Sequence, residues 1–348
     1  MTIVERARAV VGGVDTHADV HVAAAVDELG GVLGIEAFDT TEAGYRAVAC
    51  WLRSFGPVRL VGVEGTGSYG AGLARHLSRA GIDLVEVDRP NRQTRHREGK
   101  SDPIDAVAAA RAALSGLALG RPKSRDGDVE AIRVLTVVRR SATSERIVTL
   151  NQLRHLCFTA DPHIRRRFEG LSVALLTKTA AALKPRPGDD AVRYSTLFAI
   201  RALARRVVYL RDETAELTTM LKPLIDGCAP SLMTVYGIGY DVAAKLLIAA
   251  GDNPDRLTSE RAFAHMCGVA PLPASSGKTQ RHRLNRGGNR QANNALYRIV
   301  ITRMSSDERT RDYVARRRAE GKSIGEIARI LKRYVAREVF PHLRTAII

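Results

Sequence analysis

The sequence lacks the features of a secreted, membrane-spanning or zinc-stabilised protein. Its four cysteines, Cys50, Cys157, Cys228 and Cys267, stand far apart, with no Cys-x-x-Cys spacing and no histidines clustered near them. This pattern argues against a disulfide framework and against structural zinc. No apolar run approaches the roughly 20 residues that cross a bilayer, and residues 1–10 carry charges where a signal peptide is apolar. We therefore expect a globular protein that stays in the cytoplasm.

The sequence also has fewer acidic residues than basic ones. The 348 residues include 54 Lys and Arg against 37 Asp and Glu, a formal net charge of +17. Residues 1–105 hold 12 basic and 15 acidic residues, whereas residues 106–348 hold 42 and 22. A positive field of this kind attracts polyanions, and nucleic acid fits better than a membrane because no amphipathic anchor is evident. The alternative is an arginine-rich protein without such a partner.

The first 122 residues alternate short apolar strands with helices. Strand patterns cover residues 9–15, 20–26, 32–38, 58–64 and 82–87. Helices are expected at residues 41–55, before residue 80 and from residue 102, the last of them after a basic loop over residues 89–100. Three strands, helix, strand, helix, strand, helix is the order of a ribonuclease H-like α/β sheet. We expect this domain at residues 1–122.

Four carboxylates occupy the ends of these elements. Asp15 and Glu64 end strands, and Asp102 and Asp105 open a helix in the stretch KSDPID. Proline fits the first helical position, so Asp102 is expected to be the N-cap and Asp105 the third helical residue. Capping and strand ends explain these residues without any function.

If the sheet brings the four carboxylates together, they need a counter-charge. Magnesium, which prefers oxygen ligands, supplies it. Two such ions about 3.5 to 4 Å apart hold both the attacking and the leaving oxygen of a phosphodiester. The pattern therefore favours phosphoryl transfer on nucleic acid.

The glycine-rich stretch 65–70 offers a different function. Its sequence GTGSYG matches G-x-G-x-x-G, follows a strand and opens a helix, and Glu86 and Asp88 come about 20 residues later, as in dinucleotide-binding folds. Against this alternative, Glu64 would bring negative charge close to a pyrophosphate. Antiparallel-looking strands also precede the unit.

Residues 123–228 predict a helical coiled-coil region, with long helices over residues 129–157 and 192–224. Such hairpins serve as spacers or dimerisation arms, although solvated helix faces explain them equally well. Residues 229–348 predict a smaller helical unit. In it, Gly237 and Gly239 lie in a stretch with the form of a helix-hairpin-helix turn, whose backbone N–H groups can approach a phosphate.

Basic residues then surround a Ser-Ser-Gly string. Ser275 and Ser276 stand where a phosphate-facing nucleophile would need a small polar loop, although such a string is more often only a turn. Across this unit we expect contacts to nucleic acid from Gly237, Gly239, Lys278, Arg281, Arg283, Arg286, Asn289 and Arg290.

In combination, these motifs resemble a known family. The stretches 13–18, 63–69 and 100–106 look like the three blocks of the DEDD transposases of the insertion-sequence one-ten family, relatives of the pilin-gene invertase Piv. Gly237 to Gly239, the turn from Gly268 to Pro271 with the serine loop, and the Gly288-Asn289 segment are similar to that family's C-terminal transposase domain. The similarity spans nearly the whole chain.

The resemblance implies a fold, a cofactor and roles for individual residues. It implies a RuvC-like N-terminal domain, a coiled coil and a C-terminal transposase domain. Asp15, Glu64, Asp102 and Asp105 would bind Mg²⁺, with Mn²⁺ as a substitute. A serine would bond covalently to DNA, and Ser276 matches that serine better than Ser275.

The resemblance also implies partners. These are donor and target DNA, a structured noncoding RNA that pairs with both, and further copies of the chain, as a dimer or tetramer in a bacterial nucleoid. The carboxylates of one subunit and the serine of another would form a composite site. The alternatives are a RuvC-like magnesium nuclease, in which water attacks, and a binder of RNA or DNA that catalyses nothing.

Overall fold

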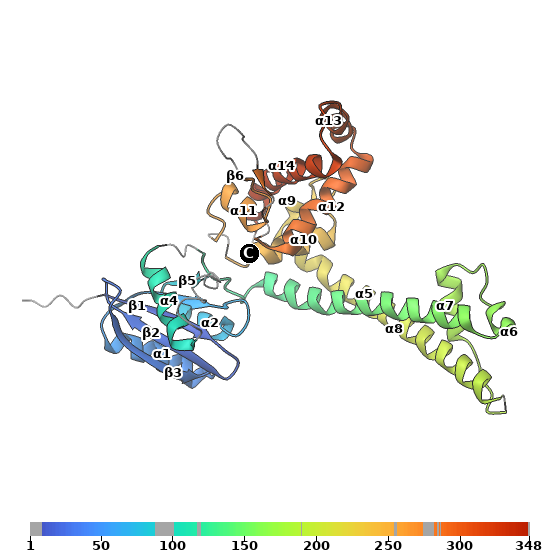
Figure 1. Cartoon of the computed structure of the whole chain (residues 1–348), viewed down its shortest axis with the longest axis horizontal. Coiled ribbons are helices and arrows are strands. Elements are labelled where there is room, and N and C mark those ends of the chain that lie inside the picture. The colour runs from blue at the N-terminus through green and yellow to red at the C-terminus, as the bar shows by residue number, and fades with distance from the viewer. Residues whose placement is uncertain are drawn as a thin grey trace, which may run out of the picture. The chain divides into compact units, whose positions relative to one another are not determined.

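The computed structural model describes residues 9–87, 101–116, 120–188, 190–253, 256–273, 282–283, 285 and 287–346. The chain divides into two compact units (Figure 1). The first comprises Met1–Gly127, Ala250–Phe263 and Ile348, and the second comprises Asp128–Ala249 and Ala264–Ile347. The predicted division into domains after residues 122 and 228 stays a prediction. The expected basic loop over residues 89–100 lies outside the described residues.

A five-stranded mixed sheet forms the centre of the first unit. Its strands are β1 (Val10–Thr16), β2 (Val20–Val26), β3 (Val32–Asp39), β4 (Val58–Glu64) and β5 (Leu84–Val87). They lie in the order β3-β2-β1-β4-β5, in which β1 pairs antiparallel with β2 and parallel with β4. The predicted ribonuclease H-like order is thus confirmed. The antiparallel half of the sheet contradicts the dinucleotide alternative, because that fold requires a mostly parallel, doubly wound sheet.

Helices cover both faces of this sheet: α1 (Glu42–Ser54), α2 (Ala71–Arg79) and α4 (Asp102–Leu114). Successive strand residues point to opposite faces. A Cβ on Gly12 would touch Leu52 of α1, whereas a Cβ on Gly13 would overlap the backbone of α4 at Ala106 and Ala110. The helix α4 therefore packs on the opposite face from α1.

Small residues let α4 run directly against the centre of the sheet. Besides the contact at Gly13, a Cβ on Gly62 of β4 would lie 2.6 Å from the carbonyl oxygen of Ala109. The helix presents buried alanines to these glycines: Ala106, Ala109, Ala110 and Ala113. No larger side chain fits between the two backbones. This close packing fixes the position of the acidic first turn of α4 relative to β1 and β4.

The second unit is mainly helical. Its elements are α5 (Asp128–Thr159), α6 (Pro162–Arg165), α7 (Val173–Ala181), α8 (Ala191–Cys228), α9 (Pro230–Met233), α10 (Tyr240–Ala250), α11 (Glu260–Met266), β6 (Leu272–Pro273), β7 (His282–Arg283), α12 (Arg290–Ser306), α13 (Glu308–Ala319) and α14 (Ile324–Arg344). The two long helices α5 and α8 pack along each other, as the sequence predicts (Figure 1). Among the described residues, no helix combines the length and the apolar character needed to cross a membrane.

Candidate functional site

Two of the predicted carboxylates lie at neighbouring strand ends. Val14 pairs with Val63 in the parallel ladder, so Asp15 and Glu64 follow at the same edge of the sheet. Each lies two residues beyond a glycine that faces α4, and side chains two apart in a strand share a face. The Thr16 hydroxyl donates a hydrogen bond of 2.8 Å to the backbone oxygen of Glu64 and holds the strand ends together. Both acidic residues are buried, with exposures of 6% and 7%.

The other two carboxylates belong to the first turn of α4. The prediction that Asp102 is the N-cap is wrong by one residue, because Ser101 has extended backbone angles and its carbonyl oxygen accepts the helical bond from the Asp105 N–H at 3.1 Å. Asp102 is therefore the first helical residue and Pro103 the second. Asp105 is 6% exposed and lies three residues after Asp102, a spacing that keeps both on one side of the helix.

His17 joins the two acidic elements. Its Nε2 atom is 3.2 Å from Asp15 Oδ2 and 3.3 Å from Asp102 Oδ1. One potential ligand atom from each of these three residues lies within 4.8 Å of the others. His17 was not predicted as a site residue from the sequence. A signal for it was present, because a histidine two positions after a strand aspartate can face the same side.

Negative charge is concentrated in the corner of the fold where the ends of β1 and β4 meet the first turn of α4. Burial raises the pKa of Asp15, the positive charge of His17 opposes the rise, and the charges of Asp105 and Asp102 add to it. Glu64 and Asp105 do not belong to this group of three residues. Both are buried, Glu64 at the end of β4 and Asp105 in the first turn of α4. Crowded carboxylate oxygens with one imidazole form a donor set that fits Mg²⁺ or Mn²⁺.

The glycine-rich turn 65–70 supports this corner from one side. Gly65 has a φ of +67°, a conformation that favours glycine, and a Cβ on Gly70 would lie 2.9 Å from the Glu64 backbone oxygen. Thr66 donates a 2.6 Å hydrogen bond to Glu86, which also lies 3.6 Å from Arg256. Glu86 is thus engaged within the fold rather than placed for a ribose. Asp88 lies outside the described residues.

A second group of predicted residues lies in the other unit. The turn between α9 and α10 has Gly237 at a φ of +88°, and a Cβ on Gly239 would meet nothing within 4 Å. The turn thus joins two helices. The helix-hairpin-helix assignment and a contact between its backbone and a phosphate stay predictions.

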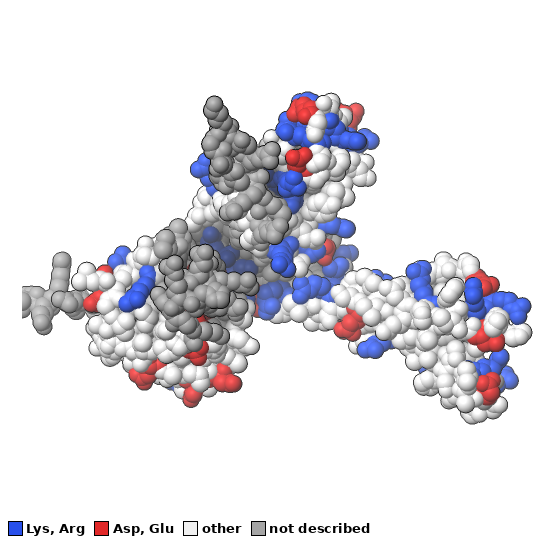
Figure 2. Space-filling view, in the orientation of Figure 1, with Lys and Arg blue, Asp and Glu red and all other residues white. Residues whose placement is uncertain are grey.

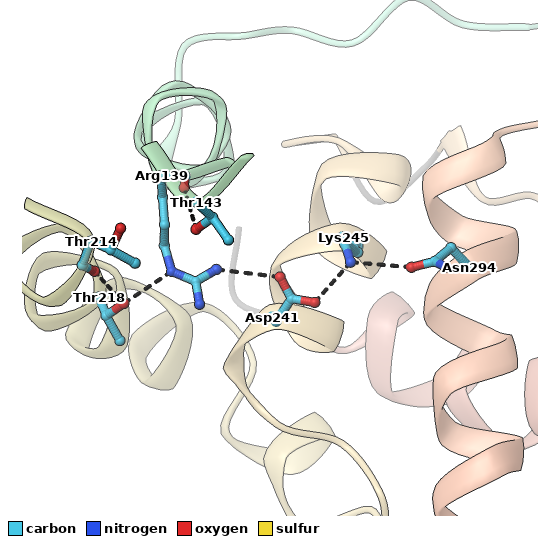
Figure 3. A network of polar contacts seen from close by, with 7 residues as sticks. All are labelled: Arg139, Thr143, Thr214, Thr218, Asp241, Lys245 and Asn294. Atoms are coloured by element: carbon cyan, nitrogen blue, oxygen red, sulfur yellow. Dashed lines mark hydrogen bonds and ion pairs between the residues drawn. The ribbon is translucent and has the colours of Figure 1, made fainter. Parts of the chain in front are cut away.

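A polar network ties this hairpin to the long helices (Figure 3). Asp241 of α10 accepts from Arg139 of α5 at 3.3 Å and from Lys245 at 2.7 Å. Arg139 also donates to Thr218 of α8 at 2.9 Å, and Lys245 to Asn294 of α12 at 3.2 Å. Burial acts to raise the pKa of Asp241, but the hydrogen bonds and charges of Lys245 and Arg139 hold it below its ordinary value. Through Arg139 and Lys245, the ionised carboxylate of α10 is therefore connected to α5, α8 and α12.

The predicted Gly268 turn and Gly288-Asn289 segment lie against each other. The Asn289 N–H donates to the Met266 carbonyl at 2.6 Å, and a Cβ on Gly268 would be 2.6 Å from the Gly287 oxygen. The Asn289 side chain also caps α12, which places Arg290 in the exposed first turn of that helix. Arg283 pairs with Leu272 in the β6–β7 ladder. Ser275, Ser276, Lys278, Arg281 and Arg286 lie outside the described residues.

A buried lysine, which was not predicted from the sequence, braces this junction. Asn293 donates to the carbonyl oxygens of Cys267 at 2.9 Å and Gly268 at 3.2 Å, and its own oxygen accepts from Lys332 at 3.0 Å. Lys332 is only 8% exposed. Burial, aided by the charge of Arg329, lowers its pKa. The pair connects α12 and α14 to the Gly268 turn.

Removing the amide of this brace should cost more stability than removing the whole pair. We expect Asn293→Leu to lower the free energy of unfolding by about 2 to 3 kcal/mol, because it leaves buried Lys332 and two backbone carbonyl oxygens without their amide partner. The double variant Asn293→Leu/Lys332→Met should recover part of that loss. Urea denaturation of the four proteins in this cycle measures the coupling. Additive losses would contradict the brace.

Comparison with known proteins assigns the chain to a family. Residues 12–158 match the DEDD transposase family of the IS110 type, and residues 229–315 match the Transposase IS116/IS110/IS902 family. The chain belongs to this transposase family. The resemblance inferred from the sequence blocks is thereby confirmed. All four carboxylates and His17 of the transposase lie within the first matched segment.

One relative comes from Streptomyces coelicolor and is named insertion element IS110 uncharacterized 43.6 kDa protein. It is 30% identical to the transposase over 127 residues, which cover 36% of this chain and 31% of the relative. The aligned segment thus spans about a third of that relative's length.

Proposed function

We propose that this transposase cuts and rejoins DNA strands by phosphoryl transfer at a divalent-metal site held by Asp15, Glu64, Asp102 and Asp105. The observation that carries the proposal is the meeting of Asp15, His17 and Asp102, whose ligand atoms lie within 4.8 Å of one another at the carboxyl end of β1, where Asp15 is buried. The DEDD family match over the same residues supports it. A binder without catalytic function would have no need for this costly concentration of buried charge.

The residues of the site would divide the work. A bound Mg²⁺ supplies positive charge that stabilises the oxygens of the scissile phosphate. Asp15 stands on the central strand β1, and Thr16 ties the end of β1 to the backbone of Glu64, so both carboxylates have fixed positions. Asp102 and Asp105 are carried by α4, whose glycine contacts with the sheet leave it little freedom to move. His17 would hold the carboxylates of Asp15 and Asp102 in place.

We propose Ser276 as the nucleophile. Its Oγ atom would bond to phosphorus and lose its proton, while the bond to the leaving DNA oxygen breaks and that oxygen takes up a proton. The phosphoserine conserves the energy of the broken bond, so reversal rejoins the strand without an external energy source. The family match over residues 229–315, which includes this serine, supports the role.

A covalent trap tests the nucleophile. The full chain is incubated with nicked DNA in Mg²⁺ and then denatured. We expect a covalent protein–DNA adduct that is lost in Ser276→Ala and kept in the matched control Ser275→Ala. Electrophoresis of end-labelled DNA measures it. Cut ends without an adduct would contradict the serine mechanism and favour the RuvC-like nuclease.

We further propose that a structured noncoding RNA guides the transposase and that a dimer or tetramer assembles a composite site. The support is the family resemblance together with the basic excess of residues 106–348, 42 Lys and Arg against 22 Asp and Glu. Under this proposal, residues 1–122 hold the metal, residues 123–228 form the helical arm and residues 229–348 carry the serine. Sequencing the nucleic acid that co-purifies with the chain tests the guide.

A further inference from the structure

The last two long helices of the chain carry an excess of positive charge. Residues 308–337, which span α13 and most of α14, hold ten Lys and Arg against four Asp and Glu. Figure 2 shows blue side chains gathered over α13. No residue of α13 is buried. The family match ends at residue 315, so most of this region lies beyond it.

Three arginines of α14 form a row, here called the arginine stripe: Arg329, Arg333 and Arg337. Residues four apart are neighbours on a helix, and like charges at that spacing destabilise it. Burial, together with the charge of Arg337, lowers the pKa of Arg333. The stripe lies away from the buried face of α14, which includes Ile327, Val335 and Val339.

Nearby carboxylates are already engaged elsewhere. Glu326 accepts from Ser323 in the capping box of α14, Glu338 forms two hydrogen bonds of 2.7 and 2.9 Å with Arg303, and Glu320 pairs with Arg317. Within the described part of the chain, no carboxylate lies at ion-pair distance from Arg329 or Arg337. Glu326 still attracts Arg329 electrostatically, so the positive charge of the two outer arginines is only partly offset by described carboxylates.

An aromatic pair accompanies the stripe. Tyr334 of α14 is 50% exposed and contacts Tyr313 of α13 edge to face, with ring centroids 6.1 Å apart. The guanidinium groups of Arg316 and Arg317 lie 5.4 and 5.9 Å from the centre of the Tyr313 ring. These cation–π contacts hold two further arginines next to the aromatic pair.

We propose that the arginine stripe, with Tyr334 beside it, binds the phosphate backbone of duplex DNA. Eight residues of helix separate Arg329 from Arg337, about 12 Å along the axis, which is close to the width of the DNA major groove. Guanidinium groups at this spacing can reach several phosphates without reading bases. The choice of DNA as the partner rests on the proposed function, whereas the binding surface itself does not.

The test compares two triple variants of the full chain in the presence of a metal chelator, so that binding is measured without DNA cleavage. R329Q/R333Q/R337Q removes the stripe, and R154Q/K178Q/R206Q removes three exposed cations from α5, α7 and α8. For each, affinity is titrated against salt with a mixed-sequence DNA duplex and with an RNA hairpin of equal length. Each lost phosphate contact lowers the salt slope by about 0.9.

For the stripe variant we expect the slope on DNA to fall by about 2 to 3 and the affinity near 0.1 M salt to fall about 10²-fold. The control should change the slope by less than about 1. An unchanged slope, a loss confined to RNA, or an equal loss in the control would overturn the proposal. If the triple variant fails to fold, R329Q/R337Q leaves Arg333 in place and should lose about two contacts. Because binding is measured without cleavage, failure here leaves the metal and serine mechanism untouched.

Discussion

Asp15→Asn is expected to reduce DNA strand cleavage by about 10²- to 10³-fold or more, because it removes a carboxylate placed at the centre of the charged corner. The amide keeps the size of the side chain and can still accept a hydrogen bond from His17. Burial and neighbouring carboxylates disfavour the ionised form of Asp15. Without metal, Asp15→Asn should therefore unfold at the same temperature as the wild type or at a higher one. Cleavage of end-labelled DNA and thermal unfolding together separate lost chemistry from lost folding.

Asp19→Asn is the matched control for this variant. Asp19 is exposed and lies four residues along the chain, and its backbone oxygen accepts a hydrogen bond from the Thr40 N–H. We expect its cleavage rate to stay within about twofold of the wild type, as for an ordinary surface substitution. If Asp15→Asn cleaved DNA as well as Asp19→Asn does, the assignment of the site would be wrong.

Gly13→Val is expected to lower the free energy of unfolding by more than about 3 kcal/mol, or to prevent folding. Even its first added carbon would overlap the backbone of Ala106 and Ala110, and backbone cannot move aside as the end of a side chain can. Either α4 leaves the sheet or β1 is distorted, and in both cases Asp102 separates from Asp15. Urea denaturation measures the loss.

Gly67→Ala is the control for that substitution. A Cβ there would meet its nearest neighbour, Arg125, at 3.7 Å, an ordinary contact. The free energy of unfolding should change by less than about 1 kcal/mol. Equal stability of Gly13→Val and Gly67→Ala would show that α4 does not pack on β1 as described.

Local patterns in the sequence predicted the fold of the first unit well. Short apolar runs, ended by Asp15 and Glu64, appear as β1 and β4, and the helix opened by the KSDPID stretch appears as α4. The predicted N-cap was wrong by one residue. The stretch KSDPID is compatible with an N-cap at Ser101 as well as at Asp102. Helix ends are decided by backbone angles that neighbouring residues determine only weakly.

Contacts between distant residues were less accessible from the sequence. His17 lies next to Asp102 only because β1 and α4 pack together, and Lys332 meets Asn293 across 39 residues. Nothing in a single sequence marks such pairs, since each residue alone suits a surface position. The role of Ser276 and the roles of the basic residues around it stay predictions.

The most direct test of the central claim is a titration of the full chain with Mn²⁺, followed by electron paramagnetic resonance of the free ion. Wild type and Asp19→Asn should bind Mn²⁺ with equal affinity, and Mg²⁺ should compete. Asp15→Asn and Asp105→Asn should each weaken binding at least about tenfold, because even the loss of a residue that only orients a ligand weakens other metal sites by about that much. Equal Mn²⁺ binding by all four proteins would contradict a metal site built from these carboxylates.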